Sequence, residues 1–213
     1  MRIKVPQDKF HLCVSLLQPS RPIFCTSKNA DGSDHVAPFS WLSPASYKPP
    51  KVALALQNER SANLSQSLVN IRREGEFVIN LPHRGQEQKL VQASFLQGDY
   101  ACKFDRTGFT RLDTQTVKPV SIEECKASLS CRVIRLLEDF GDHTLILADI
   151  VEASYEEECY GDDLCPRLDQ MEPLISLREY RFDDHQRHEF IDSAKSYLVD
   201  VYYDENHESW KKG

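Results

Sequence analysis

The chain has 213 residues, of which 40% are hydrophobic and 28% are charged, and its formal net charge is -7. This length suits one domain with a sizeable core, and the composition is that of an ordinary globular protein. A negative charge balance argues against a nucleic-acid partner, because phosphate backbones are bound by surplus lysine and arginine.

Targeting and redox signals point to the cytoplasm. No stretch is apolar for long enough to span a membrane, and the first residues lack the apolar block and cleavage site of a signal peptide. We therefore expect a cytoplasmic protein without a membrane partner. The seven cysteines contain no Cys-x-x-Cys pair, which predicts reduced thiols and neither a disulfide framework nor a zinc site.

The first half of the chain carries strand patterns. A strand is predicted over 22–29 and a returning strand over 35–41, because the Asp31-Gly32 pair between them favours a hairpin turn. A further strand is predicted over 51–57, where large and small apolar residues alternate. Its large side chains should join the core, and its alanine face should admit a bulky group close to the backbone.

Helices and strands then alternate along the chain. A helix with apolar residues at helical spacing is predicted over 64–73, just before Gly75. The later predictions are a strand over 76–82, a helix over 85–96, two long strands within 127–155 around the turn 138–143, and a helix over 183–200 capped by Asp183 or Asp184. We expect a mainly β protein, an antiparallel barrel or sandwich with peripheral α-helices, in a single domain over 1–213 with a C-terminal helical extension from about 184.

The first candidate site follows the strand predicted over 35–41. Ser40, Ser43 and Ser46 can hydrogen-bond the polar edge of a ligand, and Trp41 offers a flat wall. The alternative is a polar strand end with a tryptophan in the core. The pattern alone favours that alternative.

The second candidate site is the polar stretch before the helix predicted over 64–73. A helix start presents free amides and the positive end of the dipole, and Arg60 adds a guanidinium, so the place suits a phosphate. The alternative is simple capping of the helix by Ser61, Asn63 or Ser65.

Two histidine patterns complete the candidates. His143 stands at the start of a long strand, behind Gly141 and Asp142, and the alternative to a functional role is a turn with an exposed histidine. His185 and His188 could face one side of a helix as metal ligands, but a solvated helix start explains them more simply. We therefore expect no metal site.

Three segments, taken in this order, resemble the flavin reductase-like family. They read RPIFCTSKNADGSDHVAPFSWLSPASYKPPKVALAL, SLVNIRREGEFVINL and FGDHTLILADIV. The resemblance covers roughly residues 20–185 and implies an FMN-binding split β-barrel. It also implies a homodimer with the flavin at the subunit interface.

The resemblance also implies roles for individual residues. The isoalloxazine ring would be lined by Ala37, Pro38, Phe39, Ser40 and Trp41, with Ser43 and Ser46 at the family's asparagine and serine positions. The family's phosphate-binding Lys-Asp-Thr falls on Ser65, Gln66 and Ser67, so the lysine is missing and Arg60 is the candidate cation. His35 replaces a usual asparagine. His143 and Asp142 would be the catalytic pair near the ring.

The function implied by this resemblance is NAD(P)H-dependent flavin reduction, in which hydride passes from the nicotinamide to flavin N5. A monooxygenase or an electron-transfer protein would be the partner. Two alternatives remain at this point: a flavoredoxin-like electron carrier that keeps its FMN, and a non-redox FMN-binding protein.

Overall fold

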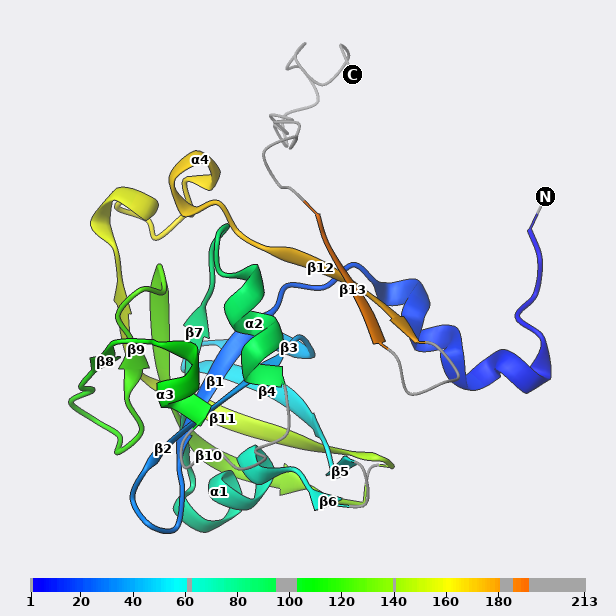
Figure 1. The fold of residues 1–213 in the computed structure, drawn as a ribbon, viewed down its shortest axis with the longest axis horizontal. Coiled ribbons are helices and arrows are strands. Elements are labelled where there is room, and N and C mark those ends of the chain that lie inside the picture. Colours follow the sequence, from blue (N-terminus) through cyan, green and yellow to red (C-terminus); the bar gives the residue numbers. More distant parts are fainter. Residues whose placement is uncertain (1, 61–62, 95–102, 140, 181–185, 192–213) are drawn as a thin grey trace.

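The structure is a computed structural model that describes residues 2–60, 63–94, 103–139, 141–180 and 186–191. For the strand residues 59–60, 63–64, 177–180 and 186–191 it describes the backbone only. Strands outnumber helices in the described part of the chain, and the helices lie around the strands (Figure 1).

The elements follow one another as η1 Gln7–Leu17, β1 Ile23–Lys28, β2 Asp34–Phe39, β3 Leu42–Tyr47, β4 Pro50–Gln57, β5 Glu59–Arg60, β6 Asn63–Leu64, α1 Gln66–Glu74, β7 Glu76–Leu81, α2 Glu87–Ser94, α3 Lys103–Thr107, β8 Arg111–Leu112, β9 Ser121–Ile122, β10 Ala127–Leu137, β11 His143–Tyr155, η2 Glu157–Cys159, α4 Leu168–Met171, β12 Ile175–Tyr180 and β13 Gln186–Ile191.

One large antiparallel sheet organises the described part of the chain. Its seven strands are ordered β2-β1-β7-β10-β11-β4-β3, and every neighbouring pair is antiparallel. The sheet is curled but not closed, because β2 and β3 remain as its two edges. Register shifts between β10 and β11 mark bulges, which bend a sheet of this kind. The predicted class, mainly β and antiparallel with peripheral helices, is confirmed.

Two apolar clusters hold the sheet and helices together. The first combines strand residues such as Ile23, Leu54 and Phe77 with Leu68 and Ile71 of α1. The second lies on the other face of β1 and β2. Its main members are Phe24, Val36, Leu90, Phe104 and Ile122. Helices α2 and α3 thus cover one face of β1 and β2, while α1 covers the other.

Local signals explain the elements that the sequence predicted. Gly32 lies in the left-handed region (φ 85°) in the turn between β1 and β2, and Gly75 does the same (φ 71°) at the end of α1. The alternating strand over 51–57 is β4, whose Val52, Leu54 and Leu56 are buried while its alanines are half-buried. The helices predicted over 64–73 and 85–96 are α1 and α2, each of which begins two residues later than predicted; residues 95–96 lie outside the described residues.

The predicted C-terminal helix is wrong over the described residues 186–191. This segment is strand β13, which pairs in antiparallel register with β12, so Ile175 lies opposite Ile191 and Tyr180 opposite Gln186. The preceding strand supplies backbone partners that a local pattern cannot reveal, and a helix would leave them unused. The rest of the predicted helix, including His185, lies outside the described residues, and so does the side chain of His188.

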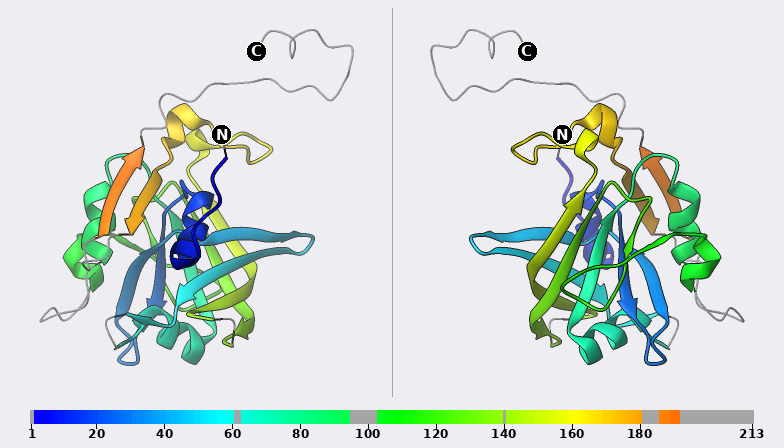
Figure 2. Two further views of the ribbon diagram at one scale, coloured as in Figure 1. Left: turned by 90° about the vertical axis from the view of Figure 1, so that its right-hand side faces the viewer. Right: turned by 90° about the vertical axis from the view of Figure 1, so that its left-hand side faces the viewer.

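The segment 42–47, for which the sequence predicted no strand, is strand β3. It pairs with β4 to form a hairpin arm, with Leu42 opposite Leu54 and Tyr47 opposite Pro50. The arm projects from the body of the sheet in both views of Figure 2. Pro44 stands inside β3, and the register shifts between Pro44 and Ser46.

Candidate functional site

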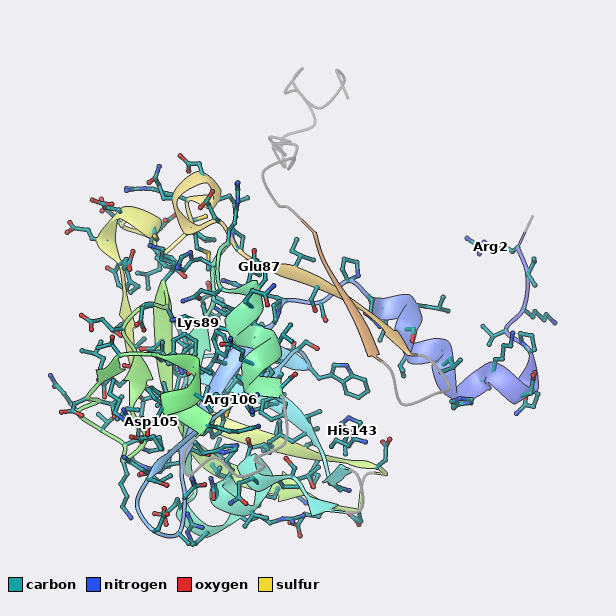
Figure 3. All side chains as sticks on the ribbon, viewed as in Figure 1. Arg2, Glu87, Lys89, Asp105, Arg106 and His143 are labelled. Atoms are coloured by element: carbon teal, nitrogen blue, oxygen red, sulfur yellow. The ribbon has the colours of Figure 1, made fainter. Side chains whose placement is uncertain are left out.

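Trp41 and His143 form a stacked aromatic pair. Trp41 lies between β2 and β3. His143, which Figure 3 labels, is the first residue of β11. Their ring centroids are 4.5 Å apart and their planes are inclined by 15°. The indole is 40% exposed, so the pair is accessible from solvent. The predicted ring-binding residue Trp41 and the predicted catalytic residue His143 are thus brought into contact.

Asp142 fixes the orientation of the imidazole. Its Oδ1 atom lies 2.7 Å from Nδ1 of His143. A carboxylate can only accept, so Nδ1 carries the proton and donates it to Asp142. Nε2 is then available to accept a hydrogen bond from a ligand, or to donate one if the ring is protonated.

A smooth, half-buried apolar face continues from the histidine. In the pairing of β11 with β4, Leu145 lies opposite Ala55 and Leu147 opposite Ala53, and residues opposite one another share a face of the sheet. His143 is on the same face because side chains alternate along a strand. The alanines leave this face flat, as the alternation in the sequence predicts. Such a face can accept a planar ring at close range.

Asn58 connects the histidine turn to the start of α1. Its amide donates to the carbonyl of Asp142 (2.9 Å), and its side chain donates from Nδ2 to the carbonyl of Gly141 (3.1 Å). Its Oδ1 accepts from the Thr144 hydroxyl (2.7 Å), and its carbonyl accepts from the amide of Ser65 (3.1 Å). The sequence analysis missed Asn58; its only sequence signal is its place at the start of a polar loop.

The start of α1 forms the second half of the site. Ser65 is the N-cap residue but makes no capping bond with its side chain. The amides of the first turn have no intrahelical acceptor. Ser67 is buried, and its hydroxyl lies 3.1 Å from Nε2 of His35, which is 2% exposed. Nδ1 of this imidazole has no hydrogen-bond partner among the residues that the structure describes.

The surroundings of His35 keep its ring neutral. Burial is the larger cause and the positive charge of Lys103 the smaller, and together they lower the pKa of His35 to about 3. Lys103, at the start of α3, is itself 8% exposed and donates from Nζ to the carbonyl of Ala93 (3.0 Å). A buried cation on α3 therefore acts on the imidazole of His35. No pattern in the sequence marks Lys103 for this place.

The remaining predicted site residues fall in three groups. Ala37, Pro38 and Phe39 lie on β2 between the two halves of the site, with Ser40 directly after them. Ser43 is exposed on the hairpin arm and donates to the carbonyl of Pro44, while Ser46 is half-buried on the same arm. The backbone of Arg60 belongs to β5, but its side chain lies outside the described residues, so its predicted role is untested.

Within the described part of the chain, no group of three histidine, cysteine, aspartate or glutamate side chains could hold a metal ion. Among the same residues, no helix is long and apolar enough to cross a membrane. The six described cysteines are free thiols. Burial raises the pKa of the Cys25 thiol to about 12, so that this sulfur is unreactive.

Comparison with known proteins identifies a family. The sequence model of the family described as "Flavin reductase like domain" matches residues 17–175. An uncharacterized protein of Archaeoglobus fulgidus is 31% identical over 121 residues, which cover 57% of this chain and 65% of that protein. The match thus spans just under two thirds of the relative.

Solved structures with the same fold include proteins of several activities. Nitrilotriacetate monooxygenase component B from Bacillus cereus has a TM-score of 0.78 at 15% identity, covering 93% of this chain and 99% of its own. A protein with a split barrel domain from Shewanella frigidimarina NCIMB 400 has a TM-score of 0.72 at 14% identity, covering 94% of both chains. Flavoredoxin of Desulfovibrio vulgaris (Miyazaki F) has a TM-score of 0.68 at 18% identity, covering 87% and 92%. At these identities the likeness establishes the split-barrel fold.

Proposed function

Because this chain belongs to the flavin reductase-like family, we propose that it binds FMN and reduces it with NADH or NADPH. The observation that carries the proposal is the arrangement around Asn58, which holds an aromatic-histidine pair on a flat apolar face beside the start of a helix. A flavin mononucleotide needs both parts: a flat wall for its ring and an anion site for its phosphate.

The described residues fit the two ends of this cofactor. Trp41, His143 and the alanine face of β4 would hold the ring, with Ala37 to Ser40 at its edge. The first turn of α1 would hold the phosphate, and the buried Ser67 lies in that turn. Ser65 and Arg60 belong to the same end of the site in our proposal.

Bound FMN would accept hydride at N5 from the nicotinamide. This transfer needs no protein nucleophile or base, so the chain contributes orientation and electrostatics. Asp142 holds the imidazole of His143 with Nε2 turned away from the carboxylate, where it can hydrogen-bond the nicotinamide amide or support negative charge on the reduced ring. Trp41 packs against the imidazole and limits its rotation.

The setting of the proposed enzyme follows from the same family. We propose a single flavin-binding domain over the whole chain, a cytoplasmic location, and a monooxygenase or electron-transfer protein as the recipient of the electrons. The six free thiols support a reducing compartment. Nitrilotriacetate monooxygenase component B, which has the same fold, supports the proposal of a monooxygenase partner.

One experiment tests the proposal directly. The purified protein is loaded with FMN, and its visible spectrum is followed without oxygen while NADH and NADPH are added separately. We expect one donor to bleach the flavin within seconds at micromolar enzyme. Tightly bound FMN that neither donor bleaches would indicate an electron carrier or a non-redox FMN-binding protein, and failure to bind FMN would contradict the proposal altogether.

Replacement of Arg60 by alanine should weaken FMN binding by about 1.5 to 3 kcal/mol, the scale of one charged hydrogen bond. The reason is that Arg60 stands closest in sequence to the start of α1, where the family's lysine is missing. Titration of flavin fluorescence gives the dissociation constants. Arg72→Ala, at the other end of α1, is the control and should leave them unchanged. An equal effect of both variants would remove Arg60 from the site.

The protein should be a dimer at micromolar concentration, and FMN should stabilise it. Large apolar side chains are exposed on η1 and on the hairpin arm, as in Leu16 (76%), Leu17 (83%) and Tyr47 (94%), and a second copy would cover them. A ligand shared between two chains binds only the assembled state, so it raises the stability of the dimer. Sedimentation with and without FMN measures both effects, and a monomer with bound FMN would exclude an interface site.

A further inference from the structure

The side chain of Asn58 spans the turn that leads into β11. Asn58 directly follows β4, which pairs with β11 in the large sheet. It donates from Nδ2 to the carbonyl of Gly141 (3.1 Å) and accepts at Oδ1 from the hydroxyl of Thr144 (2.7 Å). These two partners stand on either side of Asp142 and His143 in the chain. One side chain therefore holds both ends of the segment that carries the proposed catalytic pair.

The backbone at this turn needs such a hold. Gly141 has φ 123°, a value that favours glycine, and glycine can adopt many other backbone conformations at little cost. The amide of Asn58 donates to the carbonyl of Asp142 (2.9 Å), which extends the pairing of β4 with β11 by one step. Together with the side-chain bond to the Gly141 carbonyl, this contact selects one conformation of the turn.

Exposure decides which contacts at the turn matter most. The side chain of Asp142 is 85% exposed, and the ion pair of Arg72 with Glu138, at the other end of the turn, is also open to solvent. Charged contacts at a surface compete with water and contribute little to holding a backbone in place. Thr144 is fully buried, so water cannot easily replace the acceptor that Asn58 offers its hydroxyl. Asn58 is therefore the stronger anchor.

We propose that Asn58 is a positioning residue for flavin reduction: it holds the turn so that the imidazole of His143 stays stacked on Trp41 at the end of the flat face. The inference rests on the proposed function and deepens it, because it assigns the placement of His143 to a residue outside the catalytic pair. Asn58 acts through His143 and requires no contact with the reacting atoms.

The first test replaces Asn58 by alanine, which removes both side-chain hydrogen bonds and keeps the two backbone ones. Stopped-flow bleaching of the FMN-loaded variant by NADH or NADPH should be about tenfold slower than in wild type, the effect of a slightly misplaced group. The dissociation constant for FMN should stay within about threefold. A loss of FMN affinity as large as the loss of rate would make Asn58 a cofactor contact and would overturn the proposal.

Asn29 provides the matched control, because it holds the turn between β1 and β2 in a similar way. Its Nδ2 donates to the hydroxyl of Ser33 (3.0 Å), and its Oδ1 accepts from Nδ2 of Asn70 (2.9 Å). Asn29→Ala should lower the free energy of unfolding but bleach at the wild-type rate. Equal rates in Asn29→Ala and Asn58→Ala would mean that Asn58 has only a structural role.

Thr144 tests the same hydrogen bond from its other end. Thr144→Val keeps the shape of the side chain and removes the hydroxyl, whereas Thr144→Ser keeps the hydroxyl that donates to Asn58. Thr144→Val should slow bleaching by about three- to tenfold, and Thr144→Ser should stay within about twofold of wild type. Equal rates in these two variants would contradict the proposal.

A double-variant cycle shows whether Asn58 acts through His143. Residues that act as one unit have effects that do not add. In protein that already carries His143→Ala, the change Asn58→Ala should therefore slow bleaching by less than about twofold. A further tenfold loss in the double variant would show that Asn58 acts by another route, and the proposal would fail.

A measurement without flavin separates this inference from the proposed function. The indole of Trp41 is stacked on the imidazole of His143 at 4.5 Å, so its ring current displaces the proton resonances of His143. Replacement of Trp41 by leucine gives the undisplaced positions. Asn58→Ala should move the resonances at least halfway toward them, and Asn29→Ala should not move them.

The outcomes of the two kinds of measurement are distinct. Unmoved His143 resonances in Asn58→Ala would overturn the positioning role, whatever the protein does with flavins. A wild-type protein that binds FMN but is bleached by neither donor would instead refute the proposed reductase.

Discussion

Replacement of His143 by alanine is expected to slow the reduction of bound FMN by NADH or NADPH by about ten- to a thousand-fold. This range is typical of losing a group that positions a substrate or stabilises developing charge. The geometry supports such a role, because Asp142 and Trp41 together fix the imidazole at the end of a flat, half-buried face. Stopped-flow measurement of flavin bleaching gives the rate.

The same variant should hardly change the affinity for FMN, because the phosphate end of the site is untouched. His83→Ala, in the loop between β7 and α2, is the control and should match wild type in rate and affinity. A bleaching rate of His143→Ala within about twofold of wild type corresponds to well under one kcal/mol of barrier. That result would leave His143 as a turn residue and would favour the electron carrier.

The second large effect concerns stability in acid. The pKa of His35 is about 3 in the folded protein, against about 6.5 in an unfolded chain. Between these values only the unfolded state takes up the proton, so stability is lost as the pH falls below about 6.5. The loss should reach about 3 kcal/mol at pH 4 relative to pH 7.

This contribution is isolated by comparison with His35→Gln, which cannot titrate there. Urea unfolding of both proteins at pH 7 and pH 4 gives the two differences in free energy, and the carboxylates contribute equally to each. The charged neighbour that acts on the imidazole is Lys103 from α3, and the residue on α1 that contacts it is the uncharged Ser67. Parallel pH dependence in the two proteins would show that His35 is protonated in the folded state.

The sequence predicted those features whose cause is local. The Asp31-Gly32 turn, the alternation in 51–57 and the helix stop at Gly75 each depend on a few adjacent residues, and the structure has all three. The family resemblance added the fold, and the residues Trp41 and His143 are in contact as a shared site requires.

The features that escaped prediction depend on distant pairing. Asn58 matters because β4 and β11 run side by side and bring the turn before His143 to it. Lys103 matters because α3 covers the outer side of the β2 edge, far from α1 in the sequence. The segment 186–191 is a strand because β12 offers it a partner, whereas the spacing of its residues suggested a helix. Each case requires knowledge of which elements are neighbours in space.

The hairpin arm has a further consequence for the behaviour of the protein at high concentration. Strand β3 is an edge of the large sheet, and an open edge invites other chains to add strands and form fibrils. Pro44 removes one backbone donor from that edge, and the irregular register after it interrupts the ladder. Both features make this edge a poorer template for an added strand than an unbroken strand would be.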